Sequence, residues 1–115
     1  MKQAEATAAA QGSDKIWTKE ELMAVGEQKY NTACAGCHQP NGEGTGPFPP
    51  LKGSKIATGP VAEHITRVLK GVRMMPGFAG QLKDDELAAI ITYERNAWGN
   101  NTGSVVQPSE VKALR

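Results

Sequence analysis

Apolar positions recur at three- and four-residue spacing in three segments of the chain, and each segment predicts a helix. The first segment is residues 17–34, WTKEELMAVGEQKYNTAC. Thr18, followed three residues later by Glu21, is a capping-box pattern that starts the helix, and Trp17 is placed to staple against Leu22. The apolar face of this helix consists of Leu22, Val25, Gly26, Tyr30 and Ala33.

The second and third predicted helices are residues 61–71 and 83–98. Gly71 suits the C-terminal cap of the second helix. Acidic residues 84–86 complement the positive end of the dipole of the third helix. The apolar stripes are Val61, Ile65, Val68 and Leu69 in the second helix, and Leu87, Ile90, Ile91, Ala97 and Trp98 in the third.

The segments between and around these helices lack a helical pattern. Residues 39–60 are rich in Gly and Pro, which predicts a long loop, and residues 72–82 form a second loop. No stretch alternates with period two, so the predicted class is all-α. We expect a flexible linker over residues 1–16, one domain over residues 17–98 and a polar C-terminal tail over residues 99–115.

Composition indicates a small core and a near-neutral surface. The chain has 115 residues, of which 39% are hydrophobic and only 5% aromatic, so a bound cofactor would supply core that the side chains lack. The net charge of +1 argues against nucleic acid as a partner. No apolar run approaches the length of about 20 residues that a membrane span requires.

The chemistry of the chain concentrates in Cys34-Ala35-Gly36-Cys37-His38, which fits the C-x-x-C-H pattern of c-type haem attachment. Two vinyl groups on one porphyrin edge each take a thioether to a cysteine, and a two-residue spacer lets one helical turn reach both. The adjacent His38 then points its imidazole at the iron. This predicts one covalent haem c.

Three other readings of the same residues compete. A structural zinc site needs four ligands, and only Cys34, Cys37, His38 and His64 are available. A thioredoxin-like redox pair needs a βαβ pattern, which the sequence lacks. A plain structural disulfide between the two cysteines is the third alternative.

An electron-carrying haem iron is six-coordinate, so a second axial ligand is expected. Met75 is the first candidate, because the following Pro76 stiffens an extended loop and because 37 residues separate Met75 from His38. Ligation by His and Met raises the reduction potential of a haem. Met74 is the main rival. His64 would give a bis-histidine haem, but we interpret it as a solvated side chain on a helix flank.

The segment 17–98, with the motifs described above, resembles class I cytochromes c. The resemblance implies that fold, with three main helices plus short helical turns and long loops wrapped around the haem. It also implies that the first and last helices cross at Gly26 and Tyr30, with Ile90 and Tyr93 as partners. In this family a proline carbonyl accepts a hydrogen bond from the ligand histidine. Within the segment FPPLKG the resemblance assigns this role to Pro49. Pro50, the other half of the doubled proline, and Pro47 are the alternatives.

Two stretches resemble more specifically the cytochrome c domain fused to subunit II of caa-type haem–copper oxidases. They are WTKEELMAVGEQKYNTACAGCHQPNGEGTGPFPPLKGS and ITYERNAWGNNTGSVVQPSEV. This implies one-electron transfer from an upstream cytochrome or quinol–cytochrome c oxidoreductase to the dinuclear copper centre of that subunit. It also implies a site on the periplasmic side of the bacterial inner membrane, with the membrane reached only through a parent subunit. In that case the chain is an excised piece and Met1 an artificial start.

Other functions remain open at this point. A free-standing electron carrier and a module of a periplasmic dehydrogenase fit the same residues. A haem sensor or a peroxidase-like domain requires an open or displaceable axial site. The domain is expected to carry electrons without a reaction of its own.

Overall fold

The computed structural model describes residues 16–44, 46, 50–72 and 75–115, and it confirms the all-α class. Within these ranges the one β-type feature is an isolated bridge between Val72 and Met75. None of the helices in the described ranges is both long and apolar enough to span a bilayer. The elements are α2 (Lys19–Ala33), α3 (Ala35–His38), α4 (Lys55–Thr58), α5 (Val61–Lys70), α6 (Asp84–Asn96), η1 (Ala97–Gly99) and α7 (Pro108–Leu114).

The first predicted helix is confirmed as α2, with the predicted start. The Thr18 hydroxyl accepts from the backbone N–H of Glu21 at 3.1 Å, and the Glu21 carboxylate accepts from the N–H of Thr18 at 2.9 Å. Trp17 and Leu22, on either side of this cap, are both buried in the core. Of the predicted apolar face only Ala33 is exposed. The capping box therefore fixes where α2 begins, and the buried pair fixes how it enters the core.

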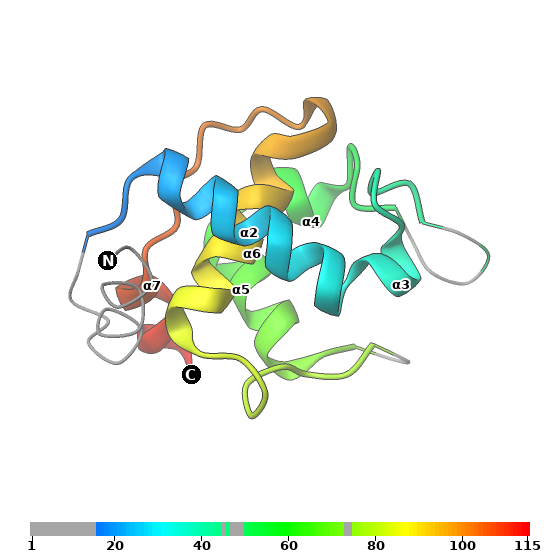
Figure 1. Ribbon diagram of the computed structural model, residues 1–115. Helices are drawn as coiled ribbons and strands as arrows, with labels where there is room; N and C mark the ends of the chain where they lie inside the picture. Colours follow the sequence, from blue (N-terminus) through cyan, green and yellow to red (C-terminus); the bar gives the residue numbers. More distant parts are fainter. Residues whose placement is uncertain (1–15, 45, 47–49, 73–74) are drawn as a thin grey trace.

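Helices α2 and α6 lie against each other across the middle of the molecule (Figure 1). A Cβ atom added at Gly26 would lie 2.7 Å from Tyr93 Cβ and would also collide with the Ala89 carbonyl. The rings of Tyr30 and Tyr93 are 5.6 Å apart between centroids. The predicted crossing is therefore present, with Ala89 and Tyr93 nearest to Gly26 and with Tyr93 also beside Tyr30.

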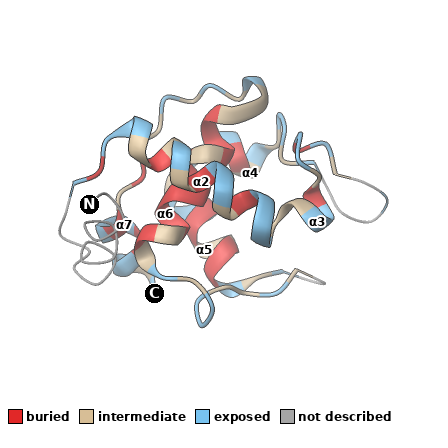
Figure 2. Cartoon of the chain, viewed as in Figure 1, coloured by how far each residue is buried: buried red, intermediate tan, exposed pale blue. Residues whose placement is uncertain are grey.

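Helix α5 covers the same core from another side, and Figure 2 shows buried residues where α2, α5 and α6 converge. Ile65, Val68 and Leu69 are buried, as the predicted stripe requires. Gly71 ends α5 with φ of 78°, in the left-handed region that favours glycine. The second helix is thus confirmed, and its cap turns the chain into the loop that carries Met75.

Residues 99–115, which we predicted to form a polar tail, contain a helix that the sequence analysis missed. Val106 and Val111 are buried in the core cluster at 1% and 0% exposure. The Gln107 side chain accepts from the backbone N–H of Trp17 at 2.8 Å and donates to the Trp17 carbonyl at 3.0 Å. These contacts pack α7 against α6 and join the two ends of the described chain. The predicted linker, residues 1–16, lies outside the described residues except for Ile16, which is exposed.

Candidate functional site

The C-x-x-C-H motif folds as a single helical turn. The N–H groups of Cys37 and His38 both donate to the Cys34 carbonyl, at 3.2 and 3.0 Å. The Cys34 side chain is half-buried, Cys37 is exposed and His38 is buried. One short element therefore presents two thiols and an imidazole together, with the second thiol toward solvent.

Two aromatic side chains from other helices hold the backbone that follows His38. The Tyr30 hydroxyl donates to the Gln39 carbonyl at 2.7 Å, and Trp98 Nε1 donates to the Pro40 carbonyl at 2.9 Å. The rings of Tyr30 and Trp98 are 5.1 Å apart between centroids, and Gln39 has the uncommon φ of 71°. Trp98 thus packs against Tyr30 and bonds to Pro40, and these contacts fix the C-terminal end of the motif.

The long loop after the motif folds back on itself, so that Leu51 and Lys52 contact Gly42 near the beginning of the loop. The Gly42 carbonyl accepts from the N–H groups of Leu51 and Lys52 at 2.7 and 2.9 Å. Gly42 itself has φ of 71° and packs against the Trp98 indole, where a Cβ atom would have no room. The segment just after Pro49 is thereby held next to the motif. Pro49 itself lies outside the described residues, so its role stays a prediction.

The loop after α5 carries Met75 and points toward the same end of the molecule as α3 (Figure 1). Val72 and Met75 exchange two backbone hydrogen bonds, at 2.9 and 3.1 Å. Met75 is half-buried against the core cluster, and Gly71 packs closely on its backbone. Met74, the rival ligand, lies outside the described residues. The choice between the two methionines stays a prediction.

His64 is buried at 1% exposure, so the interpretation of a solvated histidine is wrong. Its Nε2 lies 2.7 Å from Glu94 Oε1, and its Nδ1 lies 3.3 Å from an Arg95 guanidinium nitrogen. Both ring nitrogens are therefore engaged inside the protein. This arrangement leaves His64 no lone pair for an iron, which removes it as the alternative axial ligand.

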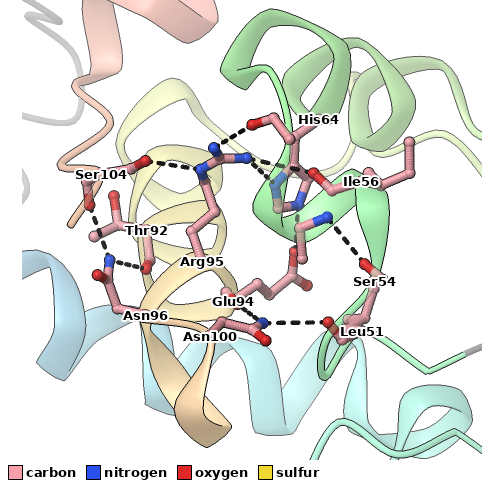
Figure 3. A network of polar contacts seen from close by, with 12 residues as sticks. Leu51, Ser54, Ile56, His64, Thr92, Glu94, Arg95, Asn96, Asn100 and Ser104 are labelled. Atoms are coloured by element: carbon pink, nitrogen blue, oxygen red, sulfur yellow. Dashed lines mark hydrogen bonds and ion pairs between the residues drawn. The ribbon is translucent and has the colours of Figure 1, made fainter. Parts of the chain in front are cut away.

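His64 belongs to a buried polar network that the sequence analysis missed (Figure 3). Glu94 and Arg95, adjacent on α6, are each 3% exposed. The Arg95 guanidinium also donates to the carbonyls of Ile56 and Gly59 and to the Ser104 hydroxyl. A signal for Glu94 was present, because it lies three residues after Ile91 and four before Trp98, at the spacing of the apolar stripe of the third predicted helix.

The donor set at α3 fits haem c and does not resemble a zinc site. Among the described residues no group of three or more His, Cys, Asp or Glu side chains is placed to hold a metal ion. Burial, followed by the Glu94 carboxylate and then Cys37, raises the pKa of the Cys34 thiol. Two thiols and one imidazole on one turn are what covalent attachment and proximal ligation of a porphyrin require.

Comparison with known proteins agrees with this assignment. The family model described as "Cytochrome C oxidase, cbb3-type, subunit III" matches residues 21–93, more than half of the chain. Cytochrome c-552 of Thermus thermophilus is 39% identical in an alignment of 89 residues, which covers 63% of this chain and 67% of that protein. Cytochrome c6 of Diacronema lutheri is 32% identical in an alignment of 75 residues, which covers 62% of this chain and 90% of that protein.

A longer relative is the cytochrome c subunit of the alcohol dehydrogenase (quinone) of Gluconobacter oxydans, which is 30% identical over 104 residues. The match covers 79% of this chain but only 22% of that subunit, so the chain corresponds to about a fifth of its length. Haem c, bound covalently and once per domain, is the cofactor that these relatives and the site indicate. The chain belongs to the cytochrome c family that the cbb3-type oxidase subunit III model describes, and it is an electron-carrying cytochrome c domain.

Proposed function

We propose that this chain relays single electrons to the dinuclear copper centre of a terminal cytochrome c oxidase. In this proposal Cys34 and Cys37 would attach the haem, and His38 and Met75 would bind its iron. The observation that supports haem attachment, on which the proposal depends, is the α3 turn, where both thiols and a buried imidazole follow one another on a backbone held by Tyr30 and Trp98.

The haem supplies a reversible one-electron couple, and the residues of the chain control its surroundings. The α3 turn holds His38 in a buried position, and the hydrogen bonds to Gln39 and Pro40 limit its movement. We assign Pro49 as the acceptor for the other ring nitrogen of His38. Because the contacts of the backbone after His38 limit its movement, the residues that would hold the haem would change little between its two oxidation states.

The exposed Cys37 indicates where electrons would pass. A thioether formed there would lie at the surface, which brings one edge of the ring toward a docking partner. The net charge of +1 offers little long-range steering. Docking at this edge would therefore depend on close contact, with an upstream cytochrome or a quinol–cytochrome c oxidoreductase as donor.

The copper centre as acceptor rests on the resemblance of residues 17–54 and 91–111 to the caa-type subunit. Thioether formation takes place outside the cytoplasm, so we place the domain on the periplasmic side of the bacterial inner membrane. The second candidate is a free or dehydrogenase-linked electron carrier. It is favoured by the similarity to cytochrome c-552 and to the cytochrome c subunit of an alcohol dehydrogenase.

The ligand assignment is tested by replacing each methionine of the pair. Met75→Ala should leave the haem covalently attached, abolish the near-infrared band of sulfur-bound ferric iron and lower the reduction potential. Met74→Ala is the matched control and should preserve both the band and the potential. The reverse result would transfer the ligand role to Met74, and rapid carbon monoxide binding by the native reduced protein would contradict a closed axial site.

The acceptor is tested by stopped-flow mixing of the reduced protein with a purified copper domain of oxidase subunit II. Rapid oxidation that saturates with the copper domain supports the relay. Slow oxidation by the copper domain, together with rapid reduction by a quinoprotein dehydrogenase, would favour the second candidate.

A further inference from the structure

The buried network of His64, Glu94 and Arg95 contains two charged side chains that have no role in the function proposed above. Arginine can only donate hydrogen bonds, so His64 Nδ1, which faces Arg95 at 3.3 Å, must be the acceptor. The ring proton then lies on Nε2 and is donated to Glu94 Oε1 at 2.7 Å. In a doubly protonated ring Nδ1 would also carry a hydrogen, so two N–H donors, that of His64 and that of Arg95, would face each other. The network assigns His64 as neutral, with a cation on one side and a carboxylate on the other.

The three side chains are held too firmly for either charge to reach solvent. Arg95 gives its remaining hydrogen bonds to Ile56, Gly59 and Ser104, and each member of the triad is at most 3% exposed. Removing a buried charge from water is costly unless it is paired and hydrogen-bonded. The Arg95 guanidinium and the Glu94 carboxylate are therefore buried as partners in one network, with the His64 imidazole between them.

The backbone of Glu94 is linked to the loop that follows the haem-attachment motif. The Asn100 side chain donates to the backbone carbonyls of Glu94 and Leu51, at 2.7 and 3.2 Å. The backbone N–H of Leu51 in turn donates to the carbonyl of Gly42, which follows the motif in the sequence. Burial, and next the charge of Glu94, raise the pKa of the Tyr30 hydroxyl, and the same two causes act on the Cys34 thiol. The Glu94 carboxylate therefore acts electrostatically on Tyr30, beside the motif, and on Cys34, within it.

We propose that Glu94 is a buried carboxylate, positioned by His64 and Arg95, whose negative charge lowers the reduction potential of the haem. The inference rests on the proposed electron-transfer function. Reduction adds one negative charge at the iron, and a nearby carboxylate opposes that charge. Because the triad is buried, water screens this repulsion much less than it would at the surface. Arg95 and His64 act as positioning residues, since their contacts hold the Glu94 carboxylate in place.

The test is the midpoint potential of three variants of the haem-loaded protein, measured by spectroelectrochemical titration at one pH and ionic strength. Glu94→Gln removes the charge while its amide oxygen can still accept from His64. Glu94→Asp keeps the charge. Glu63→Gln is the matched control, because it makes the same charge change at an exposed position next to His64 on α5.

We expect Glu94→Gln to raise the midpoint potential by about 59 mV, which for one electron is a tenfold shift of the Fe(II) to Fe(III) ratio toward Fe(II). Glu63→Gln should cause a much smaller shift, and Glu94→Asp should stay close to the native potential. An effect of Glu94→Gln no larger than that of Glu63→Gln would overturn the proposal. So would equal upward shifts for Glu94→Gln and Glu94→Asp, because they would show a packing effect. The potential is measurable whichever residue binds the sixth position, so a missing sulfur–iron band in the native protein would refute the ligand assignment separately.

Discussion

Replacing Gly26 by alanine tests the helix crossing on which the haem site is built. Glycine inside a helix costs about 1 kcal/mol relative to alanine, so on an isolated α2 the change would be stabilising. In the folded protein the new methyl group would lie 2.7 Å from Tyr93 Cβ and would press into the Ala89 carbonyl. Both obstacles are backbone or Cβ atoms of α6, which cannot rotate away.

The balance of these two effects gives the expected magnitude. Overpacking of a well-packed contact costs typically about 1–3 kcal/mol, and it costs more where backbone must move. Helices α2 and α6 would have to separate, which also loosens the Tyr30–Tyr93 contact between them. Against the propensity gain of about 1 kcal/mol, we expect a net loss of about 2 kcal/mol of unfolding free energy. For a domain of this size that is roughly 8 °C in Tm.

The assay is reversible thermal and urea unfolding of the haem-loaded protein, followed by far-ultraviolet circular dichroism. Gly80→Ala is the matched control, because a Cβ atom there meets nothing within 4 Å. The control should unfold at nearly the native temperature. A Gly26→Ala protein as stable as the native one, or more stable, would mean that α2 and α6 do not approach at this residue.

Three further changes test other parts of the fold. Trp98→Phe keeps an aromatic ring but loses the donor to the Pro40 carbonyl, so urea unfolding should report a loss of about 1 kcal/mol; an unchanged midpoint would refute the role of that hydrogen bond. Arg115→Ala, at the C-cap of α7, should lower Tm more than Lys112→Ala within α7, because the Arg115 guanidinium binds the carbonyls of residues 79 and 82 and the carboxylate of residue 84. Burial is the main cause that raises the pKa of Asp85 above its ordinary value of 3.8, so the folded state binds that proton more tightly and loses stability as pH rises above about 4. Asp85→Asn should gain unfolding free energy relative to the native protein between pH 4 and pH 7, and equal pH profiles would contradict this.

The three long helices were predictable because their signals are local. The capping box of α2, the apolar stripe of α5 and the acidic first turn of α6 each lie within one segment. Helix α7 has seven residues, too few to be stable alone. It forms because Val111 is buried in the core and Gln107 bonds to Trp17, 90 residues away in the sequence. Contacts at that separation leave no local pattern.

His64 shows a different limit of sequence reasoning. Positions 61, 64, 65 and 68 are spaced as one helical face, so the apolar stripe alone already placed this histidine toward the core. What the spacing could not supply was a partner. Glu94 and Arg95 lie on another helix, and only the packing of α5 against α6 shows that they satisfy both ring nitrogens. Without visible partners a histidine is naturally assigned to solvent, where it needs none.

The two segments expected to bind the iron are held by different kinds of contact, which bears on how the site behaves. The backbone after His38 is fixed by hydroxyl and indole donors that belong to the aromatic cluster between α2 and α6. Met75 sits in a short backbone bridge and packs only partly against the core. Opening the first segment would disrupt the main helix crossing, whereas opening the second would break a few local hydrogen bonds. Local stability follows such differences, so the attachment side should behave as part of the folded core and the methionine side as its more easily opened edge.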